Sequence, residues 1–150
     1  MFGLSRKTDY AVAALAHLAH ARQPDAQPLS ARALAAAEQM PHAMVGGLLK
    51  KLQRAGLVNS RRGVEGGYLL ADPPRQITIG RLVRAIEGPH AVKLAACCSQ
   101  PDAADPCQLL PKCPISHALQ SVNDRLEAFL EQLTLADLMP SRHDSNGRDA

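Results

Sequence analysis

Apolar residues recur at helical spacing in three consecutive segments near the N-terminus, which predicts three helices. The second of them, over residues 31–38, is short and rich in Ala. The residues expected to begin or end these helices are Ser5 or Thr8 for the first, Ser30 for the second, and Pro41 and Gly56 for the third. Three helices with short connections, the second very short, are typical of a helix-turn-helix.

Two short apolar runs follow the third helix and predict a β-hairpin. The runs are 57–61 and 68–71, and a glycine-rich turn, 62–67, separates them. A hairpin directly after the third helix is the wing of a winged helix. The turn lacks the spacing of a phosphate-binding loop and no helix follows it, so we do not expect it to bind a nucleotide.

The pattern beyond the wing predicts two more helices separated by a long segment. Thr78 is expected to cap a fourth helix over 79–87. Residues 88–113 show no periodicity and are rich in Pro and Asp. A segment of this length without internal structure usually has a function or a ligand that orders it. From Pro140 onward we expect a disordered tail.

The last helix, after Pro114, has a heptad-like apolar seam. Its members are Ile115, Leu119, Val122, Leu126, Phe129 and Leu133, with Ala118 and Leu130 beside them. The other face is expected to carry Gln120, Asn123, Asp124, Arg125 and Glu127. Such a seam packs either on its own domain or on a partner helix. The length of the seam favours pairing, and so predicts a homodimer.

Composition supports a mainly helical fold with one small hairpin. Hydrophobic residues make up 46% of the 150 residues, aromatic residues only 3%, and Trp is absent. The core must therefore be built from Ala, Leu, Val and Ile. We divide the chain into a winged helix-turn-helix domain at 1–75, a linker helix with a cysteine-bearing segment at 76–113, a dimerisation helix at 114–139, and a tail at 140–150.

The charge of the chain is unevenly distributed. Residues 1–75 carry ten Lys and Arg against five Asp and Glu, whereas residues 76–150 carry seven against nine. A basic first half is typical of a module that binds a polyanion, although charge alone is equally compatible with an ordinary solvated surface. No apolar run approaches the roughly 20 residues that span a bilayer, and no signal peptide is present, so we expect a cytosolic protein.

Basic residues cluster on the third helix and the wing. No acidic residue occurs between Lys50 and Arg62, and the cations of this stretch can neutralise DNA phosphates. The N-terminal end of the third helix is expected in the major groove and the wing in the minor groove. The predicted contacts to double-stranded operator DNA are Ser30, His42, Lys50, Lys51, Arg54, Arg61, Arg62, Gly66 and Gly67.

Four cysteines lie within the segment before the last helix: Cys97, Cys98, Cys107 and Cys113. Cytosolic cysteines are mostly reduced, so a clustered set more often binds metal or has redox chemistry than forms disulfides. Thiolates suit zinc, although no Cys-x-x-Cys pair is present, and they also suit an iron–sulfur cluster. The spacing alone does not decide between the two metals.

Three runs together resemble the Rrf-type family of winged-helix regulators: LSRKTDYAV at 4–12, LLKKLQRAGLV at 48–58 and RGVEGGYLL at 62–70. EGP at 87–89, the cysteine segment and TLADL at 134–138 also match, so the resemblance covers about residues 1–139. It implies a homodimer that binds a palindromic operator, usually as a repressor. It does not imply an enzyme, and no catalytic constellation is present.

The resemblance also implies an iron–sulfur cluster, either 2Fe-2S or 4Fe-4S, held by three cysteines. These correspond to Cys97 or Cys98, then Cys107, then Cys113. The fourth ligand varies in the family, and the matching positions are Asp9 of the partner subunit and His117. In this chain His117 follows Cys113 by four positions. Eight or nine residues separate Cys98 or Cys97 from Cys107, which is a wide spacing. The alternative is a cluster-free regulator whose thiols respond directly to oxidants or thiol-reactive signals.

Overall fold

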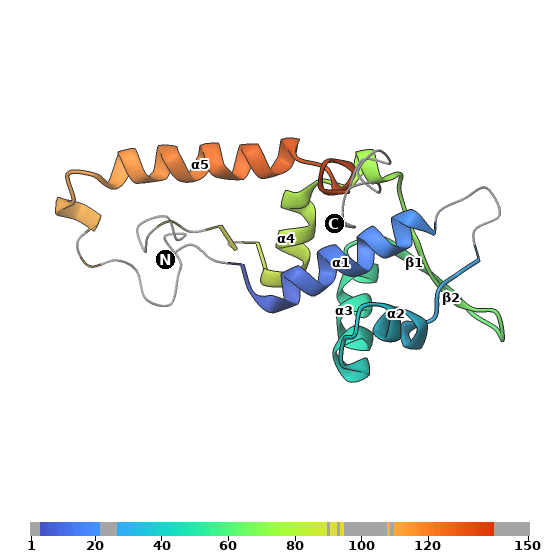
Figure 1. Ribbon diagram of the computed structural model, residues 1–150. Helices are drawn as coiled ribbons and strands as arrows, with labels where there is room; N and C mark the ends of the chain where they lie inside the picture. The colour runs from blue at the N-terminus through green and yellow to red at the C-terminus, as the bar shows by residue number, and fades with distance from the viewer. Residues whose placement is uncertain are drawn as a thin grey trace, which may run out of the picture.

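The computed structural model describes residues 4–21, 27–89, 91–92, 94, 108 and 110–139. Helices dominate this part of the chain, and one small antiparallel hairpin completes it, as the sequence predicts (Figure 1). The elements are α1 (Arg6–His20), α2 (Ala31–Ala37), α3 (His42–Arg54), β1 (Val58–Arg61), β2 (Gly67–Leu70), η1 (Pro74–Gln76), α4 (Ile79–Glu87), η3 (Leu110–Lys112), α5 (Ser116–Gln132) and η4 (Leu135–Leu138).

The hydrophobic core lies where α1, α3 and α4 meet. It consists of aliphatic side chains, as the low aromatic content requires. The largest fully buried apolar side chains are Leu15, Leu34, Val45, Leu49, Leu52, Leu57, Val58, Ile77, Leu82, Val83 and Leu135. Their burial removes apolar surface from water, which is the main force that holds these short helices together.

Two predicted caps are confirmed with their side-chain hydrogen bonds, and of the two alternatives for α1 Ser5 is the N-cap residue and Thr8 is not. Ser30 accepts the N–H of Ala33 at 3.1 Å, and Thr78 accepts that of Arg81 at the same distance. The hydroxyl of Ser5, by contrast, makes no capping bond to α1, and Thr8 lies inside that helix with 1% exposure. Both hydroxyls bond to a distant carboxylate instead, which local sequence cannot indicate.

Pro41 and Gly56 bound the third helix, although not as predicted in detail. Pro41 is the N-cap residue, and α3 begins one residue later, at His42. Gly56 follows the helix with φ of +68°, a left-handed conformation that favours glycine. The chain then turns directly into the wing, because the N–H of Leu57 bonds back to the carbonyl of Leu52 at 2.9 Å.

The wing is a two-stranded hairpin that a third segment extends. Register pairs Val58 with Leu70 and Arg61 with Gly67. On the outer side of β2, Tyr68 exchanges backbone hydrogen bonds of 3.1 and 2.8 Å with Leu29, the residue before the cap of α2. The base of the wing is therefore fixed to the helix-turn-helix on both sides.

α5 lies along one side of the molecule, and its C-terminal end packs on α4 while its N-terminal end projects beyond the other helices (Figure 1). Backbone bonds attach that C-terminal end: Ile79 N–H to the Leu133 carbonyl and Leu135 N–H to the Ile77 carbonyl, both 2.8 Å. No helix among the described residues has the length and apolar character needed to cross a membrane.

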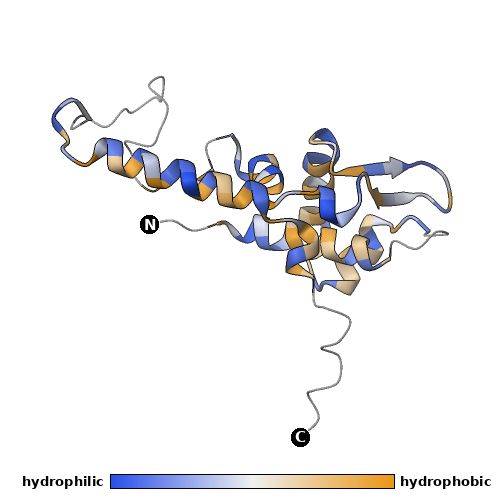
Figure 2. Cartoon of the chain, turned by 90° about the horizontal axis from the view of Figure 1, so that it is seen from above, coloured by the Kyte–Doolittle hydropathy of each residue, from blue (hydrophilic) through white to orange (hydrophobic). Residues whose placement is uncertain are grey.

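The apolar seam of α5 divides between two faces. Leu126, Leu130 and Leu133 pack against the core. Ile115, Val122 and Phe129 remain 56%, 51% and 55% exposed, and orange positions recur along the helix in Figure 2. The sequence posed packing on its own domain and pairing with a partner as alternatives. The described chain uses one half of the seam for the first and leaves the other half free.

Asn123 corrects the predicted polar face of α5. It was expected in solvent, yet it is 5% exposed. Its side-chain oxygen accepts the N–H of Leu94 at 3.2 Å, and its amide donates to Glu127 at 3.2 Å. A polar side chain can be buried at modest cost when both of its polar atoms are bonded.

Three of the four cysteines and the predicted tail from Pro140 lie outside the described residues. The division of the chain into four parts stays a prediction. The segment predicted to lack internal structure contains at least one short helix, η3, directly before Cys113.

Candidate nucleic-acid interface and cysteine segment

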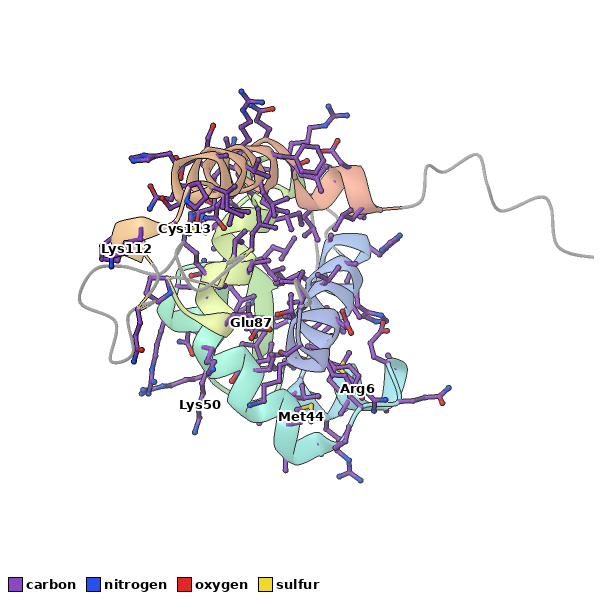
Figure 3. All side chains as sticks on the ribbon, turned by 90° about the vertical axis from the view of Figure 1, so that its left-hand side faces the viewer. Arg6, Met44, Lys50, Glu87, Lys112 and Cys113 are labelled. Atoms are coloured by element: carbon purple, nitrogen blue, oxygen red, sulfur yellow. The ribbon has the colours of Figure 1, made fainter. Side chains whose placement is uncertain are left out.

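The outer face of α3 exposes His42, Gly47, Lys50 and Arg54, while its inner face is buried in the core. Figure 3 shows Lys50 pointing away from the rest of the molecule. A β-carbon at Gly46 or at Gly47 would have no other atom within 4 Å. No internal contact therefore requires these two glycines. Their lack of a side chain leaves the face open, so that the backbone of α3 can approach DNA closely.

The wing presents cations at its free end. Arg61 and Arg62 are exposed where β1 passes into the turn. Gly66 and Gly67, predicted to contact DNA, have a structural reason to be glycine. A β-carbon would overlap the Arg61 carbonyl in the first case and the backbone of Leu29 in the second.

Lys51 and Ser30 are less available than the sequence indicates. The Lys51 ammonium donates to the carbonyl of Ile86 at 3.0 Å, in the last turn of α4. A cation at that end of a helix is favoured by the helix dipole. The Ser30 hydroxyl already accepts the cap hydrogen bond from Ala33. All four predicted contacts on α3 are exposed, namely His42, Lys50, Lys51 and Arg54, but the ammonium of Lys51 is bonded to α4.

Polar contacts that the sequence did not single out tie α3 to the wing. Gln53 on α3 donates to the hydroxyl of Ser60 on β1 at 2.8 Å. Arg81 of α4 binds the carbonyls of Ala55 and Gly56, which follow α3. Local periodicity could not reveal these pairs, because each joins residues of different elements.

Glu87, the last residue of α4, was also missed. Its carboxylate accepts the backbone N–H of Ser5 at 3.0 Å and the hydroxyls of Ser5 and Thr8. The Ser5 hydroxyl, followed by that of Thr8, holds the pKa of Glu87 below its usual 4.5. In the view of Figure 3, Glu87 lies between Cys113 and Lys50.

Both ends of the cysteine segment are attached to α5. Leu94 bonds to Asn123 in the middle of the helix, and the Cys113 carbonyl accepts the hydroxyl of Ser116, its first residue, at 3.1 Å. Ser116 and Asn123 are seven residues apart, or about 10 Å along a helix. Leu94 and the Cys113 carbonyl therefore contact α5 at two points about this far apart.

The candidate ligands are placed as follows. Cys113 is a free, half-buried thiol three residues before the start of α5, and Asp9 and His117 are exposed on α1 and α5. Cys97, Cys98 and Cys107 lie outside the described residues. In the part of the chain that is described, no three metal-ligating side chains come together. The chemistry of the donor set, four thiols with a histidine and a carboxylate, suits an iron–sulfur cluster.

Comparison with known proteins agrees with this arrangement. Residues 4–141 match the family model of Rrf2, described as an iron-dependent transcriptional regulator. The chain is 33% identical over 136 residues to the HTH-type transcriptional repressor NsrR of Streptomyces coelicolor, covering 91% of this chain and 87% of that protein. It is 30% identical over 148 residues to the HTH-type transcriptional regulator IscR of Escherichia coli, covering 97% and 86%. A solved structure of CymR, the global cysteine regulator of B. subtilis, superposes with a TM-score of 0.70 at 27% identity, covering 92% of this chain and 96% of that one.

Proposed function

The chain belongs to the Rrf2 family of transcriptional regulators, and from this premise we propose that an iron–sulfur cluster in its cysteine segment controls its binding to operator DNA. The protein is a DNA-binding regulator and not an enzyme. We further propose that it is a homodimer that represses transcription from a palindromic operator, with the cluster as the sensor.

For DNA binding we propose that the outer face of α3 enters the major groove and the wing follows the adjacent minor groove. Lys50, Arg54, Arg61 and Arg62 are exposed on these two elements, as is Lys51, whose ammonium bonds to Ile86. Phosphate neutralisation by Lys and Arg releases counterions, so affinity is expected to fall steeply with salt. His42, at the start of α3, is the polar side chain best placed to reach a base edge.

The observation that carries the cluster proposal is the attachment of both ends of the cysteine segment to α5. Leu94 stands three residues before Cys97, and Cys113 stands three residues before the first residue of α5, so thiols from both ends can converge. The N–H groups at the start of α5 favour negative charge, which thiolate ligands carry. When bound, a cluster supplies an iron centre that responds to oxidants and small ligands.

The contacts of the protein's own residues then determine how a change at the thiols alters the affinity for DNA. Leu94 and Cys113 stand on either side of the other three cysteines and both contact α5, so a change at the thiols can reach that helix. Glu87, seven residues before Leu94, bonds to Ser5 and Thr8, so such a change also alters the support of the winged domain. A coupling of about 1–3 kcal/mol changes affinity roughly 5- to 150-fold.

The test is anaerobic purification of the full chain with iron and sulfide assays and an absorption spectrum. A brown protein with iron and sulfide is expected, and Cys113→Ser should lose both while keeping its helical circular dichroism. His117→Ala and Asp9→Asn test the fourth ligand, with His20→Ala as the matched control for an exposed histidine. A colourless, iron-free protein under these conditions overturns the cluster proposal.

A cluster-free thiol sensor is the second candidate, favoured by the free, half-buried thiol of Cys113. Thiolates at the two ends of the segment would then form a disulfide or be modified directly. Cys107→Ser and Cys113→Ser, assayed separately for operator affinity with and without oxidant, distinguish the two. Oxidant sensitivity of iron-free protein supports this candidate.

A further inference from the structure

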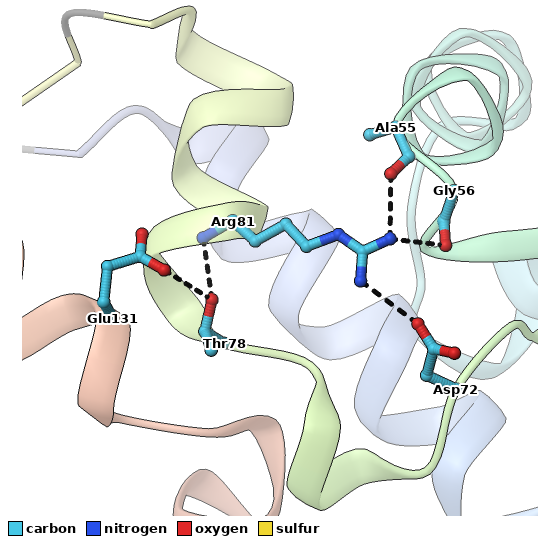
Figure 4. Close-up of polar contacts among 6 residues, drawn as sticks. All are labelled: Ala55, Gly56, Asp72, Thr78, Arg81 and Glu131. Atoms are coloured by element: carbon cyan, nitrogen blue, oxygen red, sulfur yellow. Dashed lines mark hydrogen bonds and ion pairs between the residues drawn. The ribbon is translucent and has the colours of Figure 1, made fainter.

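Arg81 joins the end of the recognition helix to the end of the wing (Figure 4). Its guanidinium donates to the carbonyls of Ala55 and Gly56, directly after α3, at 3.1 and 2.9 Å. The same group donates to the carboxylate of Asp72, two residues after β2, at 3.1 Å. A planar guanidinium with five donors in a fixed geometry can hold both elements at once. A shift of either element alone breaks part of this contact.

The same residue is connected to α5. The Thr78 hydroxyl accepts the backbone N–H of Arg81 at 3.1 Å and donates to the Glu131 carboxylate at 3.1 Å. Glu131 also forms an ion pair with Arg84, six residues after Thr78 on α4. One polar array therefore runs from α5, through the start of α4, to the ends of α3 and the wing.

Gly80 permits this approach of α5. It is buried within α4, and a β-carbon there would overlap the carboxylate of Glu131. Glycine inside a helix costs about 0.5–1 kcal/mol relative to Ala. The contact between Glu131 and α4 gives a physical reason for accepting that cost.

We propose that Arg81 is a positioning residue for DNA binding, which fixes the wing relative to the recognition helix, and that Thr78 and Glu131 pass the orientation of α5 to it. The inference rests on the proposed contact of Arg61 and Arg62 with DNA and is independent of the cluster. In a dimer joined through α5, rigid contacts at Arg81, Thr78 and Glu131 convert rotation of that helix into displacement of α3 and the wing. If these contacts are weakened, α5 can rotate without moving α3 and the wing.

The first experiment measures operator affinity against salt concentration for the full chain and for Arg81→Met. We expect binding at least about tenfold weaker and a salt slope smaller by up to about 2, because each lost phosphate contact removes about 0.9. Arg75→Met removes a cation from the neighbouring η1 helix and should change affinity less than about twofold, since it leaves the contacts of Arg81 intact. Asp72→Asn, a milder change, should act in the same direction as Arg81→Met.

A double-mutant cycle separates positioning from simple loss of stability. Arg61→Ala with Arg62→Ala should weaken binding, and adding Arg81→Met should cost little more, because the misplaced wing no longer contributes. If Arg81→Met lowers only the melting temperature, with affinity per folded dimer and salt slope unchanged, the inference is overturned. If the wing substitutions themselves change nothing, the proposed wing contact fails, and the inference with it.

Gly80→Ala tests the connection to α5 without deleting a polar group. The methyl group displaces Glu131, and we expect operator affinity to fall about fivefold, the lower end of coupling between sites. Glu131→Ala should have the same effect, and the two changes together no more than either alone. Wild-type affinity in Gly80→Ala overturns the part of the inference that involves α5.

Discussion

The carboxylate of Glu87 accepts the backbone N–H of Ser5 at 3.0 Å, so the last residue of α4 closes the N-terminus of α1 across 82 positions of sequence. The first turn of a helix leaves N–H groups without partners inside the helix. Here a distant carboxylate takes the place of a local cap. The contact thus joins the end of α4, seven residues before Leu94, to the winged domain.

Glu87→Gln is expected to destabilise the protein by about 1 kcal/mol at neutral pH, the low side for a hydrogen-bonded charge because the group is exposed. The folded-state pKa of Glu87 lies below the usual 4.5, so its contribution is present above that pH and is lost as pH falls through the folded value. The difference in unfolding free energy between wild type and variant should therefore shrink on acidification.

Urea denaturation at neutral pH and at about pH 3 measures this change. Glu65→Gln, in the wing turn, is the matched control and should alter stability little at either pH. A difference between wild type and Glu87→Gln that is the same at both pH values contradicts the prediction.

The exposed half of the α5 seam is expected to form the dimer contact. Ile115, Val122 and Phe129 recur every seven residues and are each more than half exposed. Burying such a side chain contributes about 1.5–3 kcal/mol, so Val122→Glu should raise the dimer dissociation constant at least about tenfold. Sedimentation equilibrium measures it. Ser121→Glu, one position away on a different face, should leave the dimer intact, and an unchanged dimer in Val122→Glu contradicts the assignment.

Asn123 is expected to matter for both stability and the cysteine segment. Asn123→Leu leaves the N–H of Leu94 without its partner, at a cost of about 1–3 kcal/mol if that group stays buried. Because Leu94 leads into the cysteines, cluster loss in air should also be faster. Asp124→Asn, a neighbouring exposed change, is the control. Wild-type stability and cluster lifetime in Asn123→Leu would show that this anchor is dispensable.

Gly47→Ala is expected to separate stability from DNA affinity. No internal atom opposes the added methyl group, and alanine is favoured over glycine in a helix by about 1 kcal/mol. The variant should therefore unfold at higher urea, yet bind operator more weakly, because the methyl group keeps α3 from approaching the groove. Equal or tighter binding would show that this glycine has no function in recognition.

The hydrophobic pattern was sufficient to predict the helices and the hairpin, because each has a period that local sequence displays. Ser30 and Thr78 were found as caps for the same reason, since each bonds within three residues. The exposed cations of α3 and the wing were also predictable. The contacts of Lys51 with Ile86 and of Arg81 with Asp72 were not, because they depend on how α4 is placed.

Periodicity along the chain determined which residues form helices, where the wing turns, and which positions of α5 are apolar. Only the tertiary structure decided that Asn123 is buried, that half of the α5 seam is free, and that Ser5 is bonded to Glu87. The physical reason is that the burial of a polar group depends on a partner. That partner comes from a segment whose position is set by packing and not by its distance in sequence.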